Sequence, residues 1–255
     1  MPRFFVEPKT IKGDKFSIRG REARHISTVL RLERGDTISI FDGTGKEYFA
    51  IIENAGDSGV DVRVIHEKFR ERESYVEVTL FQGLPKSTKM DLIVEKCTEI
   101  GIHRIVPIVT SRVVPDIETG KMEERRSRWE RIAKEASKQS GRTRVTEIGK
   151  IIPFKEAFKA ELDLKIVPWE DERGTGLKDV LKKCRIEAYP YRIGIFIGPE
   201  GGFTRDEIGH ARYNDAIPVS LGPNVLRTET AGLVTAAIVL YEFEPRVKNT
   251  ITSDN

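Results

Sequence analysis

The chain has 255 residues, which suits one large domain or two smaller ones. Its apolar residues make up 38%, its charged residues 33%, and its formal net charge is only +3. This composition is ordinary for a well-charged globular protein and excludes a chain that is basic throughout. No apolar run approaches the roughly 20 residues of a membrane-spanning helix.

The first residues and the cysteines favour a cytoplasmic protein. The opening ten residues, MPRFFVEPKT, carry charges and lack the apolar core of a signal peptide, so we expect none. Cys97 and Cys184 stand alone, without the spacing of a metal site. We therefore expect reduced cysteines, no bound metal and no membrane partner.

Residues 1 to about 70 have the pattern of a small β-rich domain. Turns such as Asp42-Gly43 separate short alternating runs. Apolar residues at helix spacing predict one helix from Arg21 to Arg31. The charged run Glu67 to Ser74 is typical of a linker. The predicted strands are Arg3 to Glu7, Thr37 to Phe41, Glu47 to Glu53 and Val60 to His66.

From Tyr75 onward, strands alternate with helices, which favours a mostly parallel α/β domain. The predicted strands are Tyr75 to Phe81, Arg104 to Val109, Leu164 to Val167, Arg192 to Ile197 and Pro218 to Leu221. The predicted helices are Lys89 to Ile100, Lys121 to Gln139, Leu177 to Cys184, one from Arg205, and Thr228 to Tyr241. The last helix is apolar almost all round, which predicts that it is buried.

The chain is organised around two glycine-rich turns, IGPEGG from Ile197 and LGPN from Leu221. Each turn follows a predicted strand and opens a helix, and Thr204 with Glu207 forms a capping box for the first helix. Ligands of open α/β sheets sit beyond the carboxyl ends of strands, and glycines there admit a ligand to the backbone. Two tight turns with no ligand are the alternative. Neither turn is a G-x-G-x-x-G or Walker A motif, which disfavours a dinucleotide or nucleoside triphosphate held in the usual ways.

Five segments in one order resemble the ribosomal RNA small-subunit methyltransferase E family. They are HISTVLRLERGD, QGLPKSTKMDLIVEKCTEIG, EASKQSGRTRVTEI, IGPEGGFTRDEI and LGPNVLRTETA. Because the matched segments run from near the first residues to the last helix, the resemblance covers essentially the whole chain. It is far more specific than either glycine turn by itself.

The resemblance implies a fold, a reaction and partners. The expected fold class is α/β: a SPOUT-type, trefoil-knotted, mostly parallel methyltransferase domain preceded by a small PUA-like β-barrel that binds RNA. The corresponding ranges are 1–72 for the barrel, 73–246 for the methyltransferase domain with its C-terminal knot, and 247–255 for a polar tail. The implied reaction is S-adenosylmethionine-dependent methylation of N3 of one uridine in the decoding region of 16S rRNA. The implied partners are 16S rRNA or the 30S subunit and a second copy of the chain.

The implied reaction needs a base or a positive group beside the uracil ring, and Arg227, Glu229 and Glu200 are the polar groups nearest the two glycine turns. Arg227 is expected to stabilise an oxyanion on the uracil ring or to hold a phosphate, and Glu200 or Glu229 to accept the N3 proton if burial raises its pKa. Alternatively, the negative charge of Glu229 only stabilises the partially positive N-terminal end of its helix. The resemblance implies that the cofactor-binding residues are Trp169, Glu170, Ile197, Gly198, Pro199, Glu200, Gly201, Leu221, Gly222, Val225 and Leu226.

Local excesses of basic residues indicate where RNA binds. Residues 1–36 hold nine Lys or Arg against five Asp or Glu, and residues 121–144 hold nine against four. For residues 121–135 a solvated helix face with i,i+4 pairs is the favoured interpretation. His25 and at least one of Phe4 and Phe5 are expected to pack rather than act on RNA. The candidate RNA-binding residues are Arg3, Arg21, Arg24, Arg31, Arg142 and Arg144.

Two other functions stay open on the residues themselves. One is a SPOUT methyltransferase acting on another RNA, for example on a tRNA ribose. The other is an RNA-binding ribosome assembly factor without catalytic activity. Two intact glycine turns at strand ends disfavour the assembly factor, because a protein that only binds RNA has no need of them.

Overall fold

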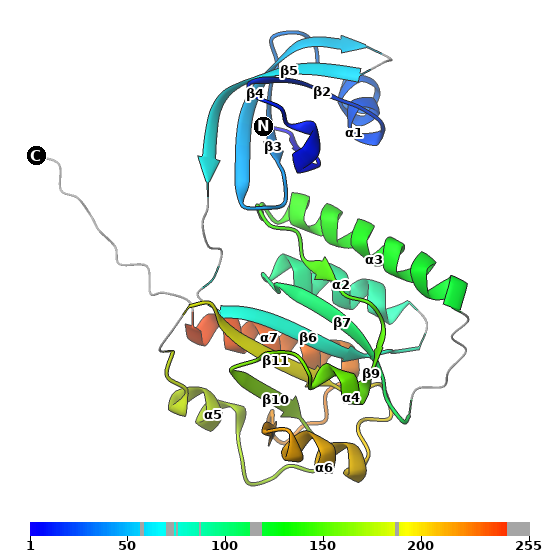
Figure 1. Cartoon of the computed structure of the whole chain (residues 1–255), viewed down its shortest axis with the longest axis vertical. Coiled ribbons are helices and arrows are strands. Elements are labelled where there is room, and N and C mark those ends of the chain that lie inside the picture. Colours follow the sequence, from blue (N-terminus) through cyan, green and yellow to red (C-terminus); the bar gives the residue numbers. More distant parts are fainter. Residues whose placement is uncertain are drawn as a thin grey trace, which may run out of the picture. The chain divides into compact units, whose positions relative to one another are not determined.

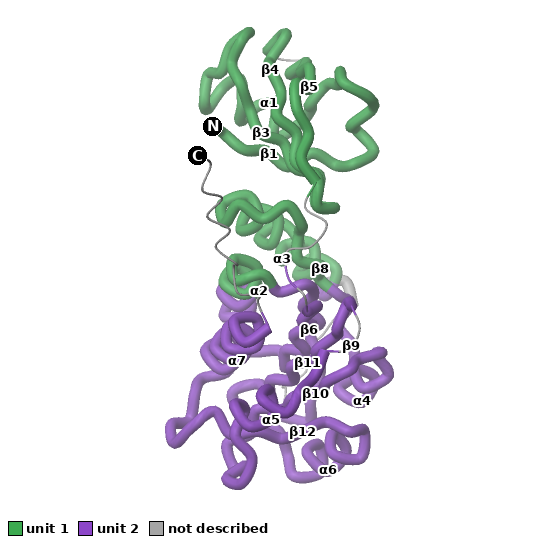
Figure 2. The backbone as a smooth tube through the Cα atoms, turned by 90° about the vertical axis from the view of Figure 1, so that its left-hand side faces the viewer, with its two compact units in different colours: residues 1–73, 94–101, 123–148 green, residues 74–93, 102–122, 149–255 purple. Residues whose placement is uncertain are grey.

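The computed structural model describes residues 1–56, 59–69, 74, 76–86, 88–112, 119–186 and 189–243. The chain forms two compact units that are not continuous in sequence (Figure 2). Unit 1 comprises residues 1–73, 94–101 and 123–148, and unit 2 comprises residues 74–93, 102–122 and 149–255. The boundary expected at residue 72 stays a prediction, and the expected polar tail lies outside the described residues.

Unit 1 is built on a five-stranded sheet in the order β1-β3-β4-β5-β2 (Figure 1). Strand β1 runs parallel to β3, and the other pairs are antiparallel. Alternate residues of these strands point inward and form one apolar core, which includes Phe4, Ile38, Ile40 and Ile52. The strands are β1 (Arg3–Phe5), β2 (Lys15–Ile18), β3 (Thr37–Phe41), β4 (Lys46–Gly56) and β5 (Gly59–Phe69).

The expected linker from Glu67 to Ser74 is wrong at its start. Strand β5 continues to Phe69, because residues 67–69 pair with residues 46–48 of β4 and satisfy their backbone groups there. The part from residue 70 to residue 73 lies outside the described residues.

The helix predicted from Arg21 to Arg31 is present but irregular. It begins as α1 (Arg21–Arg24) and continues as a π-helical turn, His25–Val29, in which the Leu30 N–H bonds the His25 carbonyl at 3.0 Å. Arg31 then takes a positive φ of 52°, which ends the helix. His25 packs edge-on against Phe4, at 5.8 Å between ring centroids, as expected. The other short elements of unit 1 are a 3-10 turn at Pro8–Thr10 and β8 (Glu147–Ile148).

Unit 2 confirms the expectation of a parallel α/β sheet. Its strands run in the order β12-β10-β11-β6-β7, β9 pairs with β7, and every one of these pairs is parallel. The strands are β6 (Val76–Gly83), β7 (Arg104–Val109), β9 (Ile152–Pro153), β10 (Leu164–Pro168), β11 (Tyr191–Ile197) and β12 (Ala216–Val219). The trefoil knot within this sheet stays a prediction.

Helices cover both faces of the parallel sheet (Figure 2). Phe81 and Phe196 stack at 4.5 Å between centroids on the face covered by α4 and α6. Leu80 and Ile197 point the other way, where α7 packs closely through Gly232. The helices of the chain are α2 (Lys89–Glu99), α3 (Thr119–Gln139), α4 (Phe154–Ala157), α5 (Leu177–Lys183), α6 (Arg205–Tyr213) and α7 (Thr228–Phe243).

The prediction that the last helix is buried holds for one side of α7 only. Its buried residues are Thr228, Gly232, Thr235, Ala236 and Val239, at helix spacing toward the sheet. On the outer side Ile238 is 42% exposed and Tyr241 is 81% exposed. A single chain offers this helix only one sheet face, so the rest of its apolar surface is left for a partner or for solvent.

Across the described ranges, no helix is both long enough and apolar enough to cross a membrane. Both cysteines are free, and burial raises the pKa of the Cys97 thiol to about 12. A thiol with so high a pKa stays protonated at neutral pH and is a poor nucleophile.

Candidate methyl-transfer site

The first glycine turn connects β11 to α6. Gly202 takes a φ of 65°, and a Cβ on Gly198 would lie 2.9 Å from the Gly202 carbonyl carbon. Gly198 is therefore required by the packing of the turn on itself, which the sequence alone does not indicate. The turn ends in the predicted capping box, in which the Thr204 hydroxyl accepts from the Glu207 N–H and the Glu207 carboxylate accepts from the Thr204 N–H.

The second glycine turn connects β12 to α7. The Gly222 N–H donates to the Ser220 hydroxyl at 3.2 Å, and Gly222 takes a φ of 119°. No atom lies within 4 Å of the position that a Gly222 Cβ would occupy, so this glycine faces open space. Its conformation excludes other residues without strain, and its surroundings leave room for a ligand.

The two turns form the walls of one pocket of about 370 Å³ in unit 2. The pocket lies beyond the carboxyl ends of three neighbouring parallel strands, β10, β11 and β12, where sites of open α/β sheets occur. Most of the residues expected at the site line it. They are Trp169, Glu170, Ile197, Gly198, Pro199, Glu200, Leu221, Gly222, Val225, Leu226 and Arg227.

Two expected site residues do not line the pocket. Gly201 turns away, and its carbonyl accepts a hydrogen bond from the Arg112 guanidinium, while the neighbouring Gly202 lines the pocket instead. Glu229 follows the start of α7, and its Oε2 atom is buried without a hydrogen-bond partner among the described residues. Both residues adjoin residues that line the pocket, but neither lines it itself.

Thr228 joins the two turns and is not among the expected residues. Its hydroxyl donates to the Gly198 carbonyl at 2.6 Å and accepts from the Gln82 side-chain amide at 2.9 Å. Thr228 is buried at the first position of α7, and Gln82 is fully buried near the end of β6. We name the Gln82–Thr228–Gly198 hydrogen bonds the turn bridge. It holds the second turn's helix against the first turn.

Arg227 has the exposed position that a ligand-binding cation needs. Its backbone carbonyl accepts from the N–H groups of Thr230 and Ala231 and so anchors the first turn of α7. Its side chain lines the pocket and is exposed. Within the described part of the chain, the guanidinium has neither a hydrogen bond nor an ion pair.

Glu200 is tied by its carboxylate rather than free to act as a base. Its oxygens accept from the Lys86 N–H at 3.0 and 3.3 Å, and its Oε1 lies 3.0 Å from the Lys89 ammonium. Burial by itself raises the pKa of Glu200, but hydrogen bonds from its own N–H, Lys89 and Lys86 outweigh burial and lower the pKa below its ordinary value. The condition for its expected role, a raised pKa, is therefore not met.

Two candidate RNA-binding residues are structural. Arg3 donates to Glu47 and to three backbone carbonyls, those of Ser137, Lys138 and Arg142, and lies 4.0 Å from the centroid of the Phe41 ring. Arg142 is buried and donates to the Thr98 carbonyl and the Thr146 hydroxyl. These guanidinium groups are largely buried and satisfy acceptors within unit 1, which disfavours the RNA contacts expected of them.

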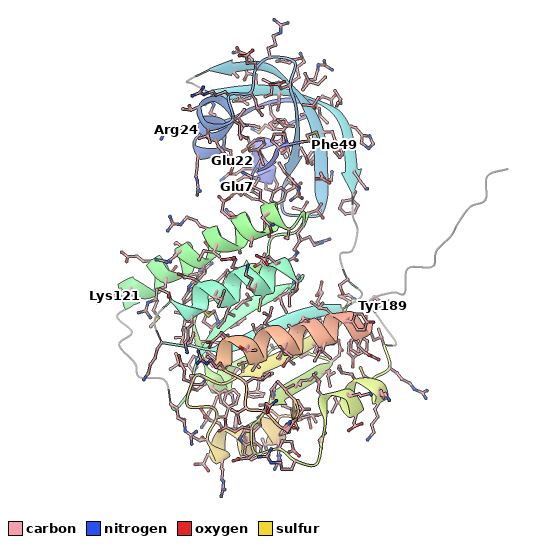
Figure 3. The ribbon with its side chains drawn as sticks, turned by 180° about the vertical axis from the view of Figure 1, so that it is seen from behind. Glu7, Glu22, Arg24, Phe49, Lys121 and Tyr189 are labelled. Atoms are coloured by element: carbon pink, nitrogen blue, oxygen red, sulfur yellow. The ribbon has the colours of Figure 1, made fainter. Side chains whose placement is uncertain are left out.

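The other four candidate RNA-binding residues differ in how far their side chains are exposed. Arg21, Arg24 and Arg31 are exposed along the irregular helix, and Arg24 is labelled in Figure 3 on the outer side of α1. Arg21 forms an exposed ion pair with Glu135 at 3.2 Å, which is worth little energetically. Arg144 is half-buried in a segment whose backbone bridges residues 43 and 44. RNA contacts of these four residues stay predictions.

Comparison with known proteins agrees with this architecture. A family model described as an RNA methyltransferase domain matches residues 72–240, and one described as an RNA methyltransferase PUA domain matches residues 18–65. The ribosomal RNA small subunit methyltransferase E of Bacillus subtilis is 31% identical over 251 residues, 96% of this chain and 98% of the relative. The protein of that name from Mycobacterium bovis is 27% identical over 241 residues, 92% and 90% of the two chains.

A solved structure is also similar over nearly the whole chain. The ribosomal RNA small subunit methyltransferase E of Neisseria gonorrhoeae, bound to S-adenosyl methionine, superposes with a TM-score of 0.82 at 29% identity. The match covers 93% of this chain and 96% of that one. The small β domain and the parallel α/β domain thus recur together in this group of proteins.

Proposed function

Because the chain belongs to the ribosomal RNA small subunit methyltransferase E family, we propose that it methylates N3 of a uridine in 16S rRNA of the small ribosomal subunit, with S-adenosylmethionine as the methyl donor. The observation that carries the proposal is the pocket formed by both glycine turns at the carboxyl ends of β10, β11 and β12. Because ribosomal subunits are assembled in the cytoplasm, we expect the protein to act there.

The residues of the pocket fit the cofactor. A volume of about 370 Å³ is within the usual range for small-molecule sites. Pro168, Ile197 and Leu226 supply apolar walls for an adenine ring, and the exposed Glu170 carboxylate can accept hydrogen bonds from ribose hydroxyls. The open space beside Gly222 allows the cofactor to reach the backbone of the second turn. When bound, S-adenosylmethionine supplies an electrophilic methyl carbon on a sulfonium sulfur.

The chain's own contribution to the reaction is orientation and charge. Uridine N3 carries a proton in its neutral form and attacks well only after losing it, which leaves negative charge on the uracil ring. We assign stabilisation of that charge to Arg227, an exposed cation of the pocket wall that directly precedes α7 and has no partner in the described chain. Glu200, with its lowered pKa, and Glu229, outside the pocket wall, act as ion-pair partners of Lys89. The N3 proton would pass to solvent before the attack, and formation of the N–C bond would then break the bond between the methyl carbon and the sulfonium sulfur, which leaves as a neutral thioether.

The reaction is tested by mapping methylated nucleotides. In cells that lack the protein, mass spectrometry of 16S rRNA is expected to show one unmethylated uridine, and the purified protein with S-adenosylmethionine is expected to restore the N3 methyl group. Methylation found on tRNA instead would establish the other enzyme function. An unchanged rRNA together with no cofactor binding in calorimetry would favour the assembly factor.

RNA binding is expected to depend on the exposed arginines of the irregular helix. Arg24→Glu combined with Arg31→Glu should weaken RNA affinity and flatten the slope of log K against log salt by about 1.5, because two phosphate contacts are lost. Affinity for S-adenosylmethionine should not change. Binding is measured by fluorescence anisotropy at several salt concentrations.

The matched control is Lys182→Glu with Lys183→Glu, which reverses the charge of two exposed lysines on α5. It changes the net charge of the protein by the same amount as the arginine variant. Equal RNA affinities in the arginine variant, the lysine variant and the unmodified protein would show that these arginines are only a solvated surface.

The outer side of α7 supports a homodimer as the working form. Ile238 and Tyr241 are large exposed side chains on a helix whose other side is packed on the sheet. Light scattering at micromolar concentration is expected to give twice the chain mass of 28.9 kDa. Tyr241→Asp should shift the protein toward the monomer, because it buries a charge in the interface. A monomer mass for the unmodified protein would contradict the proposal.

A further inference from the structure

Lys89 lies between two carboxylates that come from different parts of the chain. Its Nζ atom is 3.0 Å from Glu200 Oε1, in the first glycine turn, and 3.5 Å from Glu229 Oε2, in the first turn of α7. Lys89 is the first residue of α2 and lines the pocket. One ammonium group therefore connects three elements at the pocket wall.

Glu229 depends more on the Lys89 ammonium than Glu200 does, because Glu229 is less exposed and has fewer other partners. The Glu229 side chain is 15% exposed, against 34% for Lys89 and 29% for Glu200. Its buried Oε2 has no hydrogen bond in the described structure, so the Lys89 ammonium is the cation that compensates its charge. Glu200 has a second donor, the Lys86 N–H, and depends less on Lys89. Loss of the ammonium would leave the buried Glu229 Oε2 without a compensating cation, which is unfavourable.

The position of Glu229 couples this ion pair to the pocket. Glu229 lies two residues after Arg227, in the helical turn that begins with the Arg227 carbonyl. A displacement of this turn moves the end of the second glycine loop. The hydrogen bonds of Glu200 similarly fix the first loop.

We infer that Lys89 is a positioning residue of the methyl-transfer site: through Glu229 and Glu200 it holds the start of α7 and the first glycine turn in the arrangement that binds the cofactor. This inference rests on the proposed function, since it takes the ligand of the pocket to be S-adenosylmethionine. Lys89 acts through its carboxylate partners and does not itself take part in methyl transfer. Hydrogen bonds with Glu200 raise the pKa of the Lys89 ammonium, so this group stays positively charged throughout the neutral range.

The test compares S-adenosylmethionine affinity, by calorimetry, in four proteins: unmodified, Lys89→Met, Glu229→Gln and the double variant. Lys89→Met is expected to weaken binding roughly tenfold, the scale on which outer positioning residues act. Lys89→Met in the Glu229→Gln background should have a smaller effect, because no unpaired carboxylate remains. Lys89→Arg should bind within about threefold of the unmodified protein, since it restores the cation.

The outcomes separate this inference from the proposed function. If the unmodified protein does not bind S-adenosylmethionine, the proposed function fails. If it binds and Lys89→Met binds equally well, or if the effects of Lys89→Met and Glu229→Gln simply add, the positioning role is overturned. Thermal unfolding curves of each variant show whether the variant is folded before its affinity is compared. Should Lys89→Met not fold, Lys89→Arg and Glu229→Gln carry the comparison, and tenfold weakening in Lys89→Arg would contradict a role that needs only the positive charge.

Discussion

Arg227→Ala is expected to lower the single-turnover rate of RNA methylation by roughly a hundredfold or more, the usual effect of losing one donor to a developing oxyanion. The Arg227 side chain is exposed in the pocket wall and has no ion-pair partner in the described chain. Affinity for S-adenosylmethionine should change little, because apolar walls and backbone groups of the turns are proposed to hold the cofactor. The rate is measured at saturating RNA and saturating cofactor.

Arg173→Ala is the matched control, since Arg173 is a second exposed arginine of the same pocket wall. If Arg227 only anchors a phosphate, its loss appears in RNA affinity and saturating RNA restores the rate. A rate equal to that of the unmodified protein under these conditions would rule out the catalytic role of Arg227.

Gly222→Val is expected to abolish binding of S-adenosylmethionine. The φ of 119° at Gly222 is a conformation that a β-branched residue does not adopt without strain on the order of 1–3 kcal/mol. The side chain would also project into the open space that we assign to the cofactor. Calorimetric titration measures the loss.

Two further variants separate strain from steric exclusion. Gly222→Ala introduces a similar backbone strain with a smaller side chain, so it should retain more affinity than Gly222→Val. Gly209→Ala in α6 is the control, because Gly209 has no positive φ and also faces open space. Unchanged affinity in Gly222→Val would refute the placement of the cofactor at the second turn.

Local patterns in the sequence account for much of the fold. The strands Thr37–Phe41 and Arg104–Val109 have the predicted bounds, because alternating or continuous apolar residues between turn residues define strands well. The Thr204–Glu207 capping box has both of its predicted hydrogen bonds, because they connect residues only three positions apart. Four elements of two to four residues, β2, β8, β9 and α4, are too short to produce a clear period and were not predicted.

The errors at the candidate sites have a different cause: the partners are distant in sequence. Arg3 bonds carbonyls 134 to 139 positions away, so nothing in its neighbourhood distinguishes it from an exposed arginine that awaits RNA. Thr228 binds Gln82 across 146 positions and Gly198 across 30. The glycine turns themselves are visible in the sequence, whereas the side chains that join them become identifiable only once the sheet brings them together.

The turn bridge has a consequence for how the pocket responds to its ligand. Because Gln82, Thr228 and Gly198 are linked by hydrogen bonds, the two loops cannot open independently without leaving a buried donor or acceptor unsatisfied. A ligand that displaced one loop would therefore also strain the hydrogen bonds that tie this loop to the start of α7.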